Sequence, residues 1–531
     1  MQEQQRILKG VALLSVAALV AKMLSAAYRI PYQNLAGDLG FYVYQQVYPI
    51  YGIVMVLAMY GLPVVFSKQR ATLLSRGEEE EAKQLTSLFF YGYLVAALVL
   101  WIITYTQASG LAMVMGDPQL VEPIKAISFI LFLFPFLSVS RGYQQSKGEL
   151  YSTAMSHIAE QFIRVVLIIA ITIYFVSQGF SAYQIGAGAA YGSIFGAVAG
   201  VIVMTMMTKG TWLKEAVFLK GFSLKKAAGT YVNISKQSLF ICLSSLLLIL
   251  FQMVDALTIV RLLEGYGLSS AEAYVTKGIY DRGQPLLQLG TVLTTTFTLA
   301  LVPMVSKAVA LGKRDEANQF QQLSYRLTLI VGGAASLGLM IIIEETNHML
   351  FTNSIGADVL QVMAFVIILS SFFITLSAVL QGYDQIHLPV IAVVTGLVSK
   401  VVGHLLFIPI YGIMAAAYST VFAFIIMISY LLFVARKKRV LYIGELNNFR
   451  AILLLLGVMG VVSLLWKNGI LSLGIEQTRI NDALVALSTV AIGAFVVIGC
   501  LMLFSIFSED EWNAIPKMNK VRSRIKGWCK R

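Results

Sequence analysis

The stretch Tyr280–Glu316, YDRGQPLLQLGTVLTTTFTLALVPMVSKAVALGKRDE, decides the fold class. It opens with the charge pair Asp281-Arg282, continues as an apolar, threonine-rich run and ends in a segment of mixed charge. A membrane-spanning helix needs ~20 mostly apolar residues, and this run supplies them. Charges beside such a run are costly in a bilayer and usually face a cavity or a partner. The stretch therefore predicts a transmembrane helix with charged residues at its entrance.

The composition of the whole chain agrees with a membrane protein. Of 531 residues, 58% are hydrophobic and only 13% are charged, whereas a soluble domain carries about 25% charged residues. Long unbroken apolar runs predict helices rather than the ~10-residue alternating strands of a membrane β-barrel. The net charge of +13 could suggest nucleic-acid binding, but the basic residues lie mostly in short loops and the tail. We expect an all-α polytopic membrane protein that binds no nucleic acid.

About fourteen apolar segments are long enough to span a membrane. With the N-terminus in the cytoplasm, the even-numbered loops and both termini hold about 30 of the 40 Lys and Arg residues. This bias predicts that both termini are cytoplasmic. Because Lys22 interrupts the first segment, we read it as an uncleaved helix rather than a signal peptide. The predicted spans are 9–28, 41–66, 86–107, 120–140, 152–177, 183–207, 237–260, 285–306, 325–343, 360–381, 388–409, 411–434, 450–466 and 483–507.

Short motifs recur in the two halves of the chain. GLPVVFSK at 61–68 resembles LVPMVSK at 301–307, and RGYQQ at 141–145 resembles QGYDQ at 381–385, each with an offset of 240 positions. Parallel repeats are a recurrent plan of transporters, with the substrate site between the repeats. The motifs therefore predict two parallel-related six-helix lobes, followed by an extra C-terminal helix pair.

The predicted domain organisation follows from this repeat. We expect an N-lobe at 1–210, a basic cytoplasmic linker at 211–236, a C-lobe at 237–440 and two extra helices at 441–507. The basic tail at 508–531 is expected to be a cytoplasmic helix held at anionic headgroups, with partner binding as the alternative.

The first two helices contain candidate substrate-binding residues. Lys22 and Arg29 are seven positions apart and share a helix face. Lys22 has no nearby carboxylate and is expected to face a cavity, whereas Arg29, next to Pro31, faces the cavity or snorkels to the interface. Tyr48 belongs to the segment FYVYQQVYPIY at 41–51. This segment is either an interfacial aromatic belt or a sugar-contacting surface.

The fifth helix of each half contains ionisable residues at equivalent positions. Glu160 and Arg164 are four residues apart, so an intrahelical ion pair is the default expectation. The offset of 240 aligns them with Lys400 and His404. Asp255 needs a partner, for which Lys400 is the candidate, or it binds a coupling cation. These five residues predict either a structural charge network or a coupling and gating site.

No catalytic motif is present. The sequence contains no Walker A loop, no metal-spaced histidines and no nucleophile elbow with partners. The three cysteines have no metal-ligand spacing. We therefore expect no enzymatic activity and no cofactor. Without an ATP site, transport would be passive or driven by a Na⁺ or H⁺ gradient or by the membrane potential.

The opening stretch resembles the eighth helix of the MurJ family of lipid II flippases. The matching positions are Tyr280, Asp281, Arg282, Pro285, Gly290, Pro303, Ser306, Lys307, Gly312, Asp315 and Glu316. Residues 28–52, YRIPYQNLAGDLGFYVYQQVYPIYG, look closer still to the polysaccharide-biosynthesis branch that includes stage V sporulation protein B. Both groups belong to the multidrug/oligosaccharidyl-lipid/polysaccharide (MOP) exporter superfamily.

This resemblance implies a V-shaped pair of lobes around a cationic cavity that binds a pyrophosphate. Arg29 and Arg282 match the pyrophosphate-binding positions, with Asp38 and Asp281 as accompanying acids. The last two helices would form a groove for the lipid tail.

Two departures from the family pattern concern the second helix and the ion site. The second helix has Tyr and Gln where the family has a cavity arginine. By resemblance, Asp255 occupies a sodium-binding position. Lys400, however, lies near the expected sodium ligands, so its ammonium could replace the ion.

The resulting prediction is a flippase for an undecaprenyl-pyrophosphate-linked saccharide, such as lipid II, in the bacterial cytoplasmic membrane. A cation-coupled drug exporter and a membrane scaffold for cell-wall synthesis are the alternatives. The expected partners are membrane lipids and cell-wall enzymes, and the chain is expected to be a monomer. The predicted substrate-binding residues are Lys22, Arg29, Asp38, Tyr48, Asp281 and Arg282.

Overall fold

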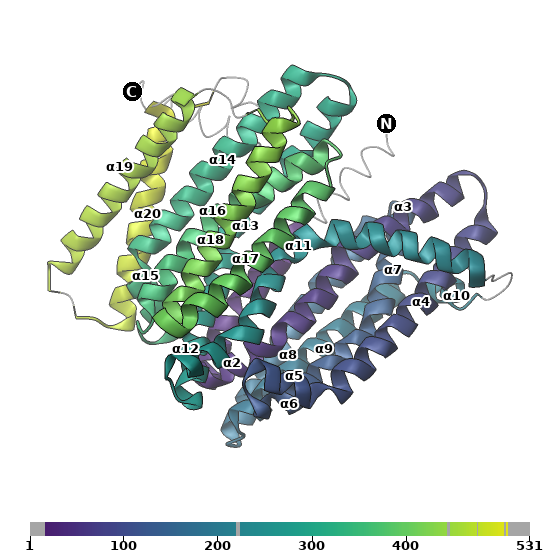
Figure 1. Ribbon diagram of the computed structural model, residues 1–531, viewed down its shortest axis with the longest axis horizontal. Coiled ribbons are helices and arrows are strands. Elements are labelled where there is room, and N and C mark those ends of the chain that lie inside the picture. Colours follow the sequence, from purple (N-terminus) through teal and green to yellow (C-terminus); the bar gives the residue numbers. More distant parts are fainter. Residues whose placement is uncertain are drawn as a thin grey trace. The chain divides into compact units, whose positions relative to one another are not determined.

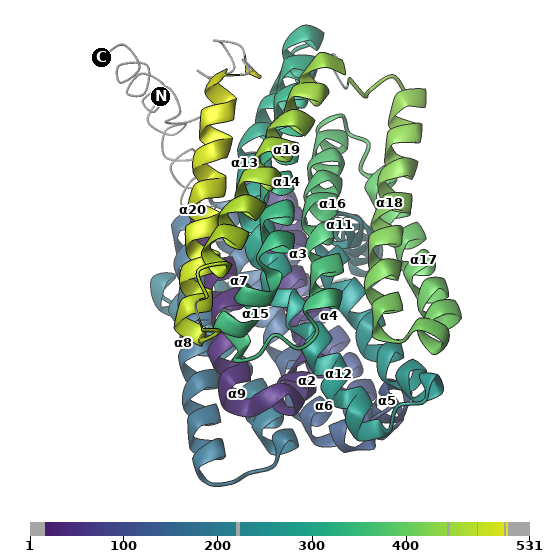
Figure 2. The same ribbon diagram turned by 90° about the vertical axis from the view of Figure 1, so that its left-hand side faces the viewer.

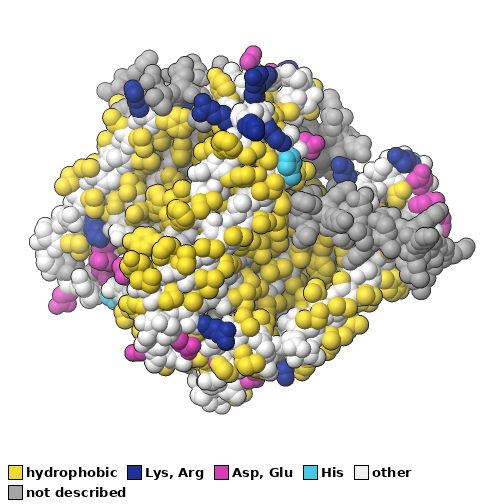
Figure 3. Space-filling model, in the orientation of Figure 1, with side chains coloured by type: hydrophobic (Ala, Val, Ile, Leu, Met, Phe, Trp, Pro, Cys, Tyr) yellow, Lys and Arg dark blue, Asp and Glu magenta, His cyan; other side chains and the backbone are white. Residues whose placement is uncertain are grey.

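The computed structural model describes residues 16–17, 19–218, 224–442, 446–474, 476–503 and 506–507. Every regular element in these ranges is a helix (Figure 1), which confirms the all-α prediction. The predicted tail at 508–531 lies outside the described residues. Hydrophobic side chains cover much of the face shown in Figure 3, as expected for a surface in contact with lipid.

Twelve helices in the described part of the chain are long and apolar enough to cross a membrane. The first, Leu19–Ser75, is a continuous run that covers the second half of the predicted span 9–28 and all of the predicted span 41–66. Another predicted span, 285–306, lies in α13 (Gly283–Ala310), whose side chains are only partly described. The twelve candidates are therefore compatible with the predicted fourteen.

The chain packs as two compact units. Unit 1 comprises Met1–Val292 and Ile386–Met427. Its helices are α2 (Arg29–Val56), η1 (Leu57–Gly61), α3 (Leu62–Ser75), α4 (Glu79–Thr106), α5 (Ala108–Met115), η2 (Pro118–Leu120), α6 (Val121–Ser128), η3 (Phe129–Leu133), α7 (Phe134–Ser146), α8 (Leu150–Ser177), α9 (Ala182–Met207), α10 (Thr211–Ala216), α11 (Leu224–Tyr266), α12 (Ser270–Asp281) and α17 (His387–Tyr411). Residues 211–236, predicted as a linker, contain α10 and the start of α11.

Unit 2 comprises Leu293–Gln385 and Ile428–Arg531. Its helices are α14 (Arg314–Ile341), α15 (Ile343–Phe351), α16 (Ala357–Gly382), α19 (Leu446–Leu471) and α20 (Arg479–Leu503). The chain passes between the units within α13, between α16 and α17, and within α18 (Ile413–Lys437). In Figure 2, α19 and α20 run side by side.

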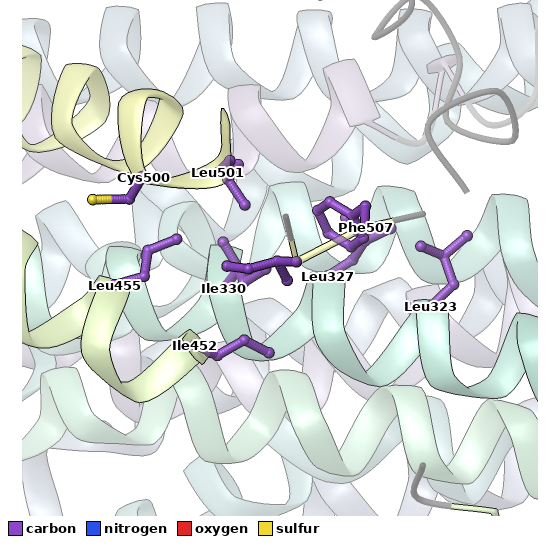
Figure 4. Close-up of a cluster of buried hydrophobic side chains, with 9 residues drawn as sticks. Leu323, Leu327, Ile330, Ile452, Leu455, Cys500, Leu501 and Phe507 are labelled. Atoms are coloured by element: carbon purple, nitrogen blue, oxygen red, sulfur yellow. The ribbon is translucent and has the colours of Figure 1, made fainter. Parts of the chain in front are cut away.

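A hydrophobic cluster joins α14, α19 and α20 inside unit 2 (Figure 4). Its buried members are Leu323, Leu327, Ile330, Ile452, Leu455, Cys500, Leu501, Ile506 and Phe507. Two side-chain contacts join α19 and α20 to α15: Lys467 forms an ion pair with Glu345 at 2.8 Å, and His348 Nδ1 lies 2.5 Å from Asp482. The extra helix pair is therefore firmly packed within unit 2.

The segment between the first two predicted spans is helical rather than a loop. The backbone of Tyr28 is helical (φ −66°, ψ −23°), and α2 begins at Arg29 with Pro31 in its first turn, where proline is tolerated. Gly37 interrupts α2 because its φ of 71° lies in the left-handed region. Glycine adopts that region without a steric penalty. This break precedes Asp38.

The two copies of the repeated motifs pack in the same way. A Cβ atom added at Gly142 would lie 3.1 Å from the Cα of Pro63. A Cβ atom added at Gly382 would lie 3.0 Å from the Oγ of Ser306. In each case the glycine of the second motif lies against the first motif within the same unit. The repeat is therefore visible in contacts as well as in sequence.

Candidate functional site

Arg29 is fully buried in unit 1, and no ion pair with a described residue compensates its charge. The guanidinium lies over the ring of Tyr48, 4.2 Å from its centroid. None of its three side-chain nitrogens makes a hydrogen bond of ordinary geometry to a described residue. Buried donors without partners are costly and usually indicate an unseen ligand, ion or water. Arg29 therefore does not snorkel to an exposed interface.

Arg164 of α8 is a second buried arginine without a carboxylate partner in the described part of the chain. Its Nη2 donates to the Oγ of Ser25 at 3.0 Å. Its guanidinium lies 5.0 Å from the ring centroid of Tyr28 and 4.8 Å from that of Tyr51. The Nε makes no hydrogen bond to any residue in the described ranges. Tyrosine faces stabilise a cation electrostatically but cannot neutralise it.

The predicted intrahelical ion pair between Glu160 and Arg164 is wrong. Glu160 instead accepts a hydrogen bond from Nη2 of Arg141 at 2.5 Å, and both side chains are fully buried. An i,i+4 pair contributes only about 0.2–0.5 kcal/mol, so a buried partner on another helix outweighs it. The sequence prediction missed Arg141, although it lies in the repeated RGYQQ motif next to a predicted span.

Arg29 and Arg164 differ from the other buried Lys and Arg side chains of unit 1 in their ion pairing. Seven Lys and Arg side chains are buried among its described residues. Five form ion pairs of 2.5–2.8 Å: Arg70–Glu215, Arg141–Glu160, Lys277–Asp281, Arg282–Asp38 and Lys400–Asp255. Within this described set, Arg29 and Arg164 remain without a carboxylate. A buried anion would complete both.

Asp38 and Arg282 are brought together in a two-point ion pair. Nε of Arg282 donates to one carboxylate oxygen at 3.0 Å, and Nη2 donates to the other at 2.7 Å. Gln33 donates to the same carboxylate at 2.9 Å. Gly278 of α12 has no side chain where the carbonyl of Asp38 packs. In this state Arg282 is therefore engaged by a protein carboxylate.

Asp281 is paired with Lys277, which the sequence prediction did not single out. The ammonium lies 2.6 Å from both carboxylate oxygens. Burial raises the pKa of Asp281 to about 6, although the ammonium of Lys277 opposes the shift. The spacing of four residues within one helix was the available signal for this pair.

Asp255 forms the predicted ion pair with Lys400, at 2.8 Å. Nε2 of His404 lies 3.7 Å from the same carboxylate, and its Nδ1 is hydrogen-bonded to Thr258 at 2.8 Å. No group of three or more His, Cys, Asp or Glu residues suited to a metal ion occurs in the described ranges. A coupling role for this cluster stays a prediction.

The tyrosines of α2 do not form a lipid-facing belt. Tyr42, Tyr44, Tyr48 and Tyr51 are each at most 6% exposed. The hydroxyl groups of Tyr44 and Tyr28 lie 2.9 Å apart. Tyr28, Tyr44, Tyr48 and Tyr51 therefore form a buried wall around the two arginines, whereas Tyr42 donates to Asp117. Sugar contact stays a prediction.

Lys22 is not grouped with the buried arginines. It lies in the helical segment before Tyr28, and its side chain is exposed. The backbone stays helical through Tyr28, so the face predicted to be shared by Lys22 and Arg29 is not broken there. A substrate-binding role for Lys22 stays a prediction.

Glycines on α9 allow α8 to pack closely against it. This packing positions Glu160 and Arg164 of α8. A Cβ atom at Gly196 would lie 2.8 Å from the carbonyl oxygen of Glu160 and 2.9 Å from the Cα of Arg164. A Cβ atom at Gly192 would lie 2.9 Å from the backbone nitrogen of Ile168. Small residues at four-residue spacing let membrane helices approach closely. The position of Arg164 therefore depends on the absence of side chains on α9.

Comparison with known sequences gives several full-length matches. The family described as polysaccharide biosynthesis protein matches residues 7–309. The Bacillus subtilis membrane protein YabM is 35% identical and covers 97% of this chain and 96% of its own. Stage V sporulation protein B of B. subtilis is 26% identical, covering 98% and 99%. The lipid II flippase MurJ of B. subtilis is 23% identical, covering 93% and 95%.

Solved structures show a similar fold. MurJ in an inward closed conformation aligns with a TM-score of 0.68 and 15% identity, covering 93% of this chain and 98% of that chain. An inward-facing multidrug resistance transporter of the MATE family, within the MOP superfamily, aligns with a TM-score of 0.65 and 15% identity, covering 81% and 98%. The transporter fold predicted from the sequence is therefore confirmed.

Proposed function

This chain belongs to the polysaccharide biosynthesis protein family, and from that premise we propose that it moves an undecaprenyl-diphosphate-linked saccharide across the membrane. The observation that carries the proposal is Arg29, a buried cation whose three donors have no partner among the described residues. A relative named as a lipid II flippase supports the substrate class. The proposed substrate is lipid II or a related cell-wall precursor.

A diphosphate would supply the negative charge and the hydrogen-bond acceptors that the guanidinium of Arg29 lacks. The guanidinium presents a planar set of donors that binds two phosphate oxygens at once. Inside a low-dielectric protein the attraction between the two charges is stronger than in water. The described packing closes over Arg29, so the substrate enters when neighbouring helices separate. The site then opens to each side of the membrane in turn, while the lipid tail stays in the bilayer.

Other residues contribute around this centre. Tyr48 orients Arg29 by lying under its guanidinium. The pair Asp38–Arg282 ties α2 to the C-terminal end of α12, whereas the pair Lys277–Asp281 lies within α12. Arg282 keeps Asp38 as its partner and contributes by positioning α2 beside α12.

The cluster of Asp255, Lys400 and His404 has the coupling role in this proposal. Lys400 already neutralises the carboxylate at 2.8 Å. A coupling cation is therefore not needed to balance Asp255 in this state, and a proton is the ion expected to move here.

The buried charges disfavour a cationic drug as substrate. Neither Arg29 nor Arg164 has a carboxylate partner in the part of the chain that the structure describes, and a cation placed beside them would be repelled. The likeness to a multidrug transporter concerns the fold alone. An anionic substrate is the better match.

The test uses bacterial cells depleted of their own lipid II flippases. The wild-type chain, Arg29→Ala, Arg282→Ala and the surface control Arg76→Ala are expressed at matched levels. The measured quantity is the fraction of lipid II accessible at the outer leaflet. We expect rescue by the wild type and the control, little rescue by Arg29→Ala, and reduced rescue by Arg282→Ala.

The outcomes separate the substrate from the site. No rescue by well-expressed wild type would contradict lipid II as the substrate. Full rescue by Arg29→Ala would retain the flippase but remove Arg29 from its site.

A further inference from the structure

The two arginines expected to bind diphosphate differ in availability. Arg282 is held by both oxygens of Asp38, with hydrogen bonds of 2.7 and 3.0 Å. Arg29 has no hydrogen-bonded partner among the described residues. A single guanidinium cannot bind both phosphates of a diphosphate with two-point geometry. A second available cation is therefore needed near Arg29.

Arg164 has the properties of that second cation. It is only 1% exposed and has no ion pair in the described part of the chain. It shares the tyrosine wall with Arg29: Arg164 lies over Tyr28, the residue before Arg29, while Arg29 lies over Tyr48. Its hydrogen bond at 3.0 Å goes to the uncharged Ser25. A phosphate oxygen can displace a hydroxyl without leaving an unpaired charge.

The close packing of α8 against α9 determines the position of Arg164. Gly196 allows the backbone of α8 at Glu160 and Arg164 to pack directly against α9. Glu160 is occupied by Arg141, so it does not draw the guanidinium of Arg164 away from the tyrosines. Arg164 is therefore held in place without an ion pair to any described residue.

We propose that Arg164 is a diphosphate-binding residue of this chain, acting with Arg29 across the buried tyrosine wall. Arg164 thus supplies, from the fifth predicted span, positive charge that α2 itself provides only at Arg29. This inference rests on the proposed function and deepens it by assigning the second phosphate. It differs from a structural role because the arginine must change ligand affinity and not only stability.

The experiment measures binding to the purified full-length protein in detergent. The probes are geranyl diphosphate, geranyl monophosphate and geraniol, which differ only in phosphate number. Affinity is taken from the ligand-dependent rise in the unfolding temperature and from titration calorimetry. The variants are Arg29→Gln, Arg164→Gln, Arg164→Lys and Arg282→Gln. Arg76→Gln is the control, because this exposed residue loses the same charge.

Replacing Arg164 by glutamine would remove its charge-assisted hydrogen bonds to phosphate. Bonds of this kind are among the strong ones, so Arg164→Gln should weaken diphosphate binding about tenfold to a hundredfold. Monophosphate binding should weaken less, because one phosphate can use Arg29 alone. Arg164→Lys should give an intermediate affinity, because lysine keeps the positive charge but loses the planar donors that bind two phosphate oxygens at once. Arg76→Gln should bind like the wild type.

The outcomes also distinguish the two proposals. Unchanged diphosphate affinity in Arg164→Gln, with loss in Arg29→Gln, would overturn the role of Arg164 and leave the proposed function standing. Absence of diphosphate binding by the wild type would overturn both. If Arg164→Gln does not fold, Arg164→Lys decides, because wild-type affinity in that variant would contradict two-point binding.

Discussion

At the residue scale, Asp281 binds its proton more tightly in the folded protein, because burial raises its pKa from 3.8 to about 6. Between these values the folded state holds more protons than the unfolded chain. Stability should therefore fall as the pH rises from about 4 to 6, by up to about 3 kcal/mol. Thermal unfolding of the wild type and Asp281→Asn across this range checks the prediction. The wild type should lose stability relative to the variant, and a constant difference would contradict it.

Asp255 and Lys400 allow a second test at this scale. Removing one partner of a buried ion pair costs about 3–5 kcal/mol, because the other charge is left uncompensated. We expect Asp255→Asn and Lys400→Met each to lower the unfolding temperature strongly. The double variant should recover much of the loss, as measured by a double-mutant cycle in detergent. Additive losses would show that the two side chains are not coupled.

The sequence predicted some residue contacts and missed others for physical reasons. The partner of Asp255 could be inferred because an isolated carboxylate in a span needs a cation. Glu160 was assigned to Arg164 because spacing along one helix is visible in sequence. Its true partner, Arg141, comes from another helix, and such pairing depends on packing that spacing does not reveal.

At the element scale, the two repeated glycines pack at equivalent positions but against atoms that differ in how easily they can move. A Cβ atom at Gly142 would meet the ring of Phe66 and the backbone of Pro63, which cannot rotate away, whereas one at Gly382 would meet the Oγ of Ser306, which can. Gly142→Ala should therefore cost about 1–3 kcal/mol, and Gly382→Ala less than about 1 kcal/mol. Chemical or thermal unfolding measures both.

Gly338 provides the control for these substitutions. It lies within α14 with open space around it, so alanine should be neutral or stabilising by up to about 1 kcal/mol. Equal losses in Gly142→Ala and Gly382→Ala would contradict the contact argument.

Helix boundaries were predicted less well than helix existence. The first predicted span ended at residue 28, yet the helix continues through Tyr28 into α2, where Pro31 fits the first turn. The true break occurs at Gly37, where a positive φ is adopted. From the sequence, Gly37 could not be distinguished from other glycines, because a positive φ leaves no mark in the residue type beyond glycine itself.

At the scale of the whole molecule, the transporter fold followed from apolar spans and repeated motifs. The buried wall of tyrosines did not, because an aromatic belt and an interior cluster have the same composition. The orientation of the chain remains a prediction from its Lys and Arg distribution. It places 178–181 and 472–478 outside the cell and 209–218 inside.

Cysteine labelling tests this orientation. We expect Ser181→Cys and Thr478→Cys to react with a membrane-impermeant maleimide in intact cells. Lys209→Cys should react only after permeabilisation. The unsubstituted chain, with its native cysteines, is the background control. Labelling of all three variants in the reverse pattern would invert the predicted topology.

The glycines of α9 have a consequence for inheritance. They position Arg164 because they have no side chains where α8 packs against α9. The position of this charge is therefore encoded in part by glycine codons, although glycine has no functional group. In a saturation-mutagenesis selection, changes at Gly192 and Gly196 should be recovered as null or temperature-sensitive alleles about as readily as changes at the arginines. Compensating alleles should appear on α8, where smaller side chains restore the space. The close packing of α8 against α9 thus limits which substitutions the protein tolerates as much as the charges of its buried arginines do.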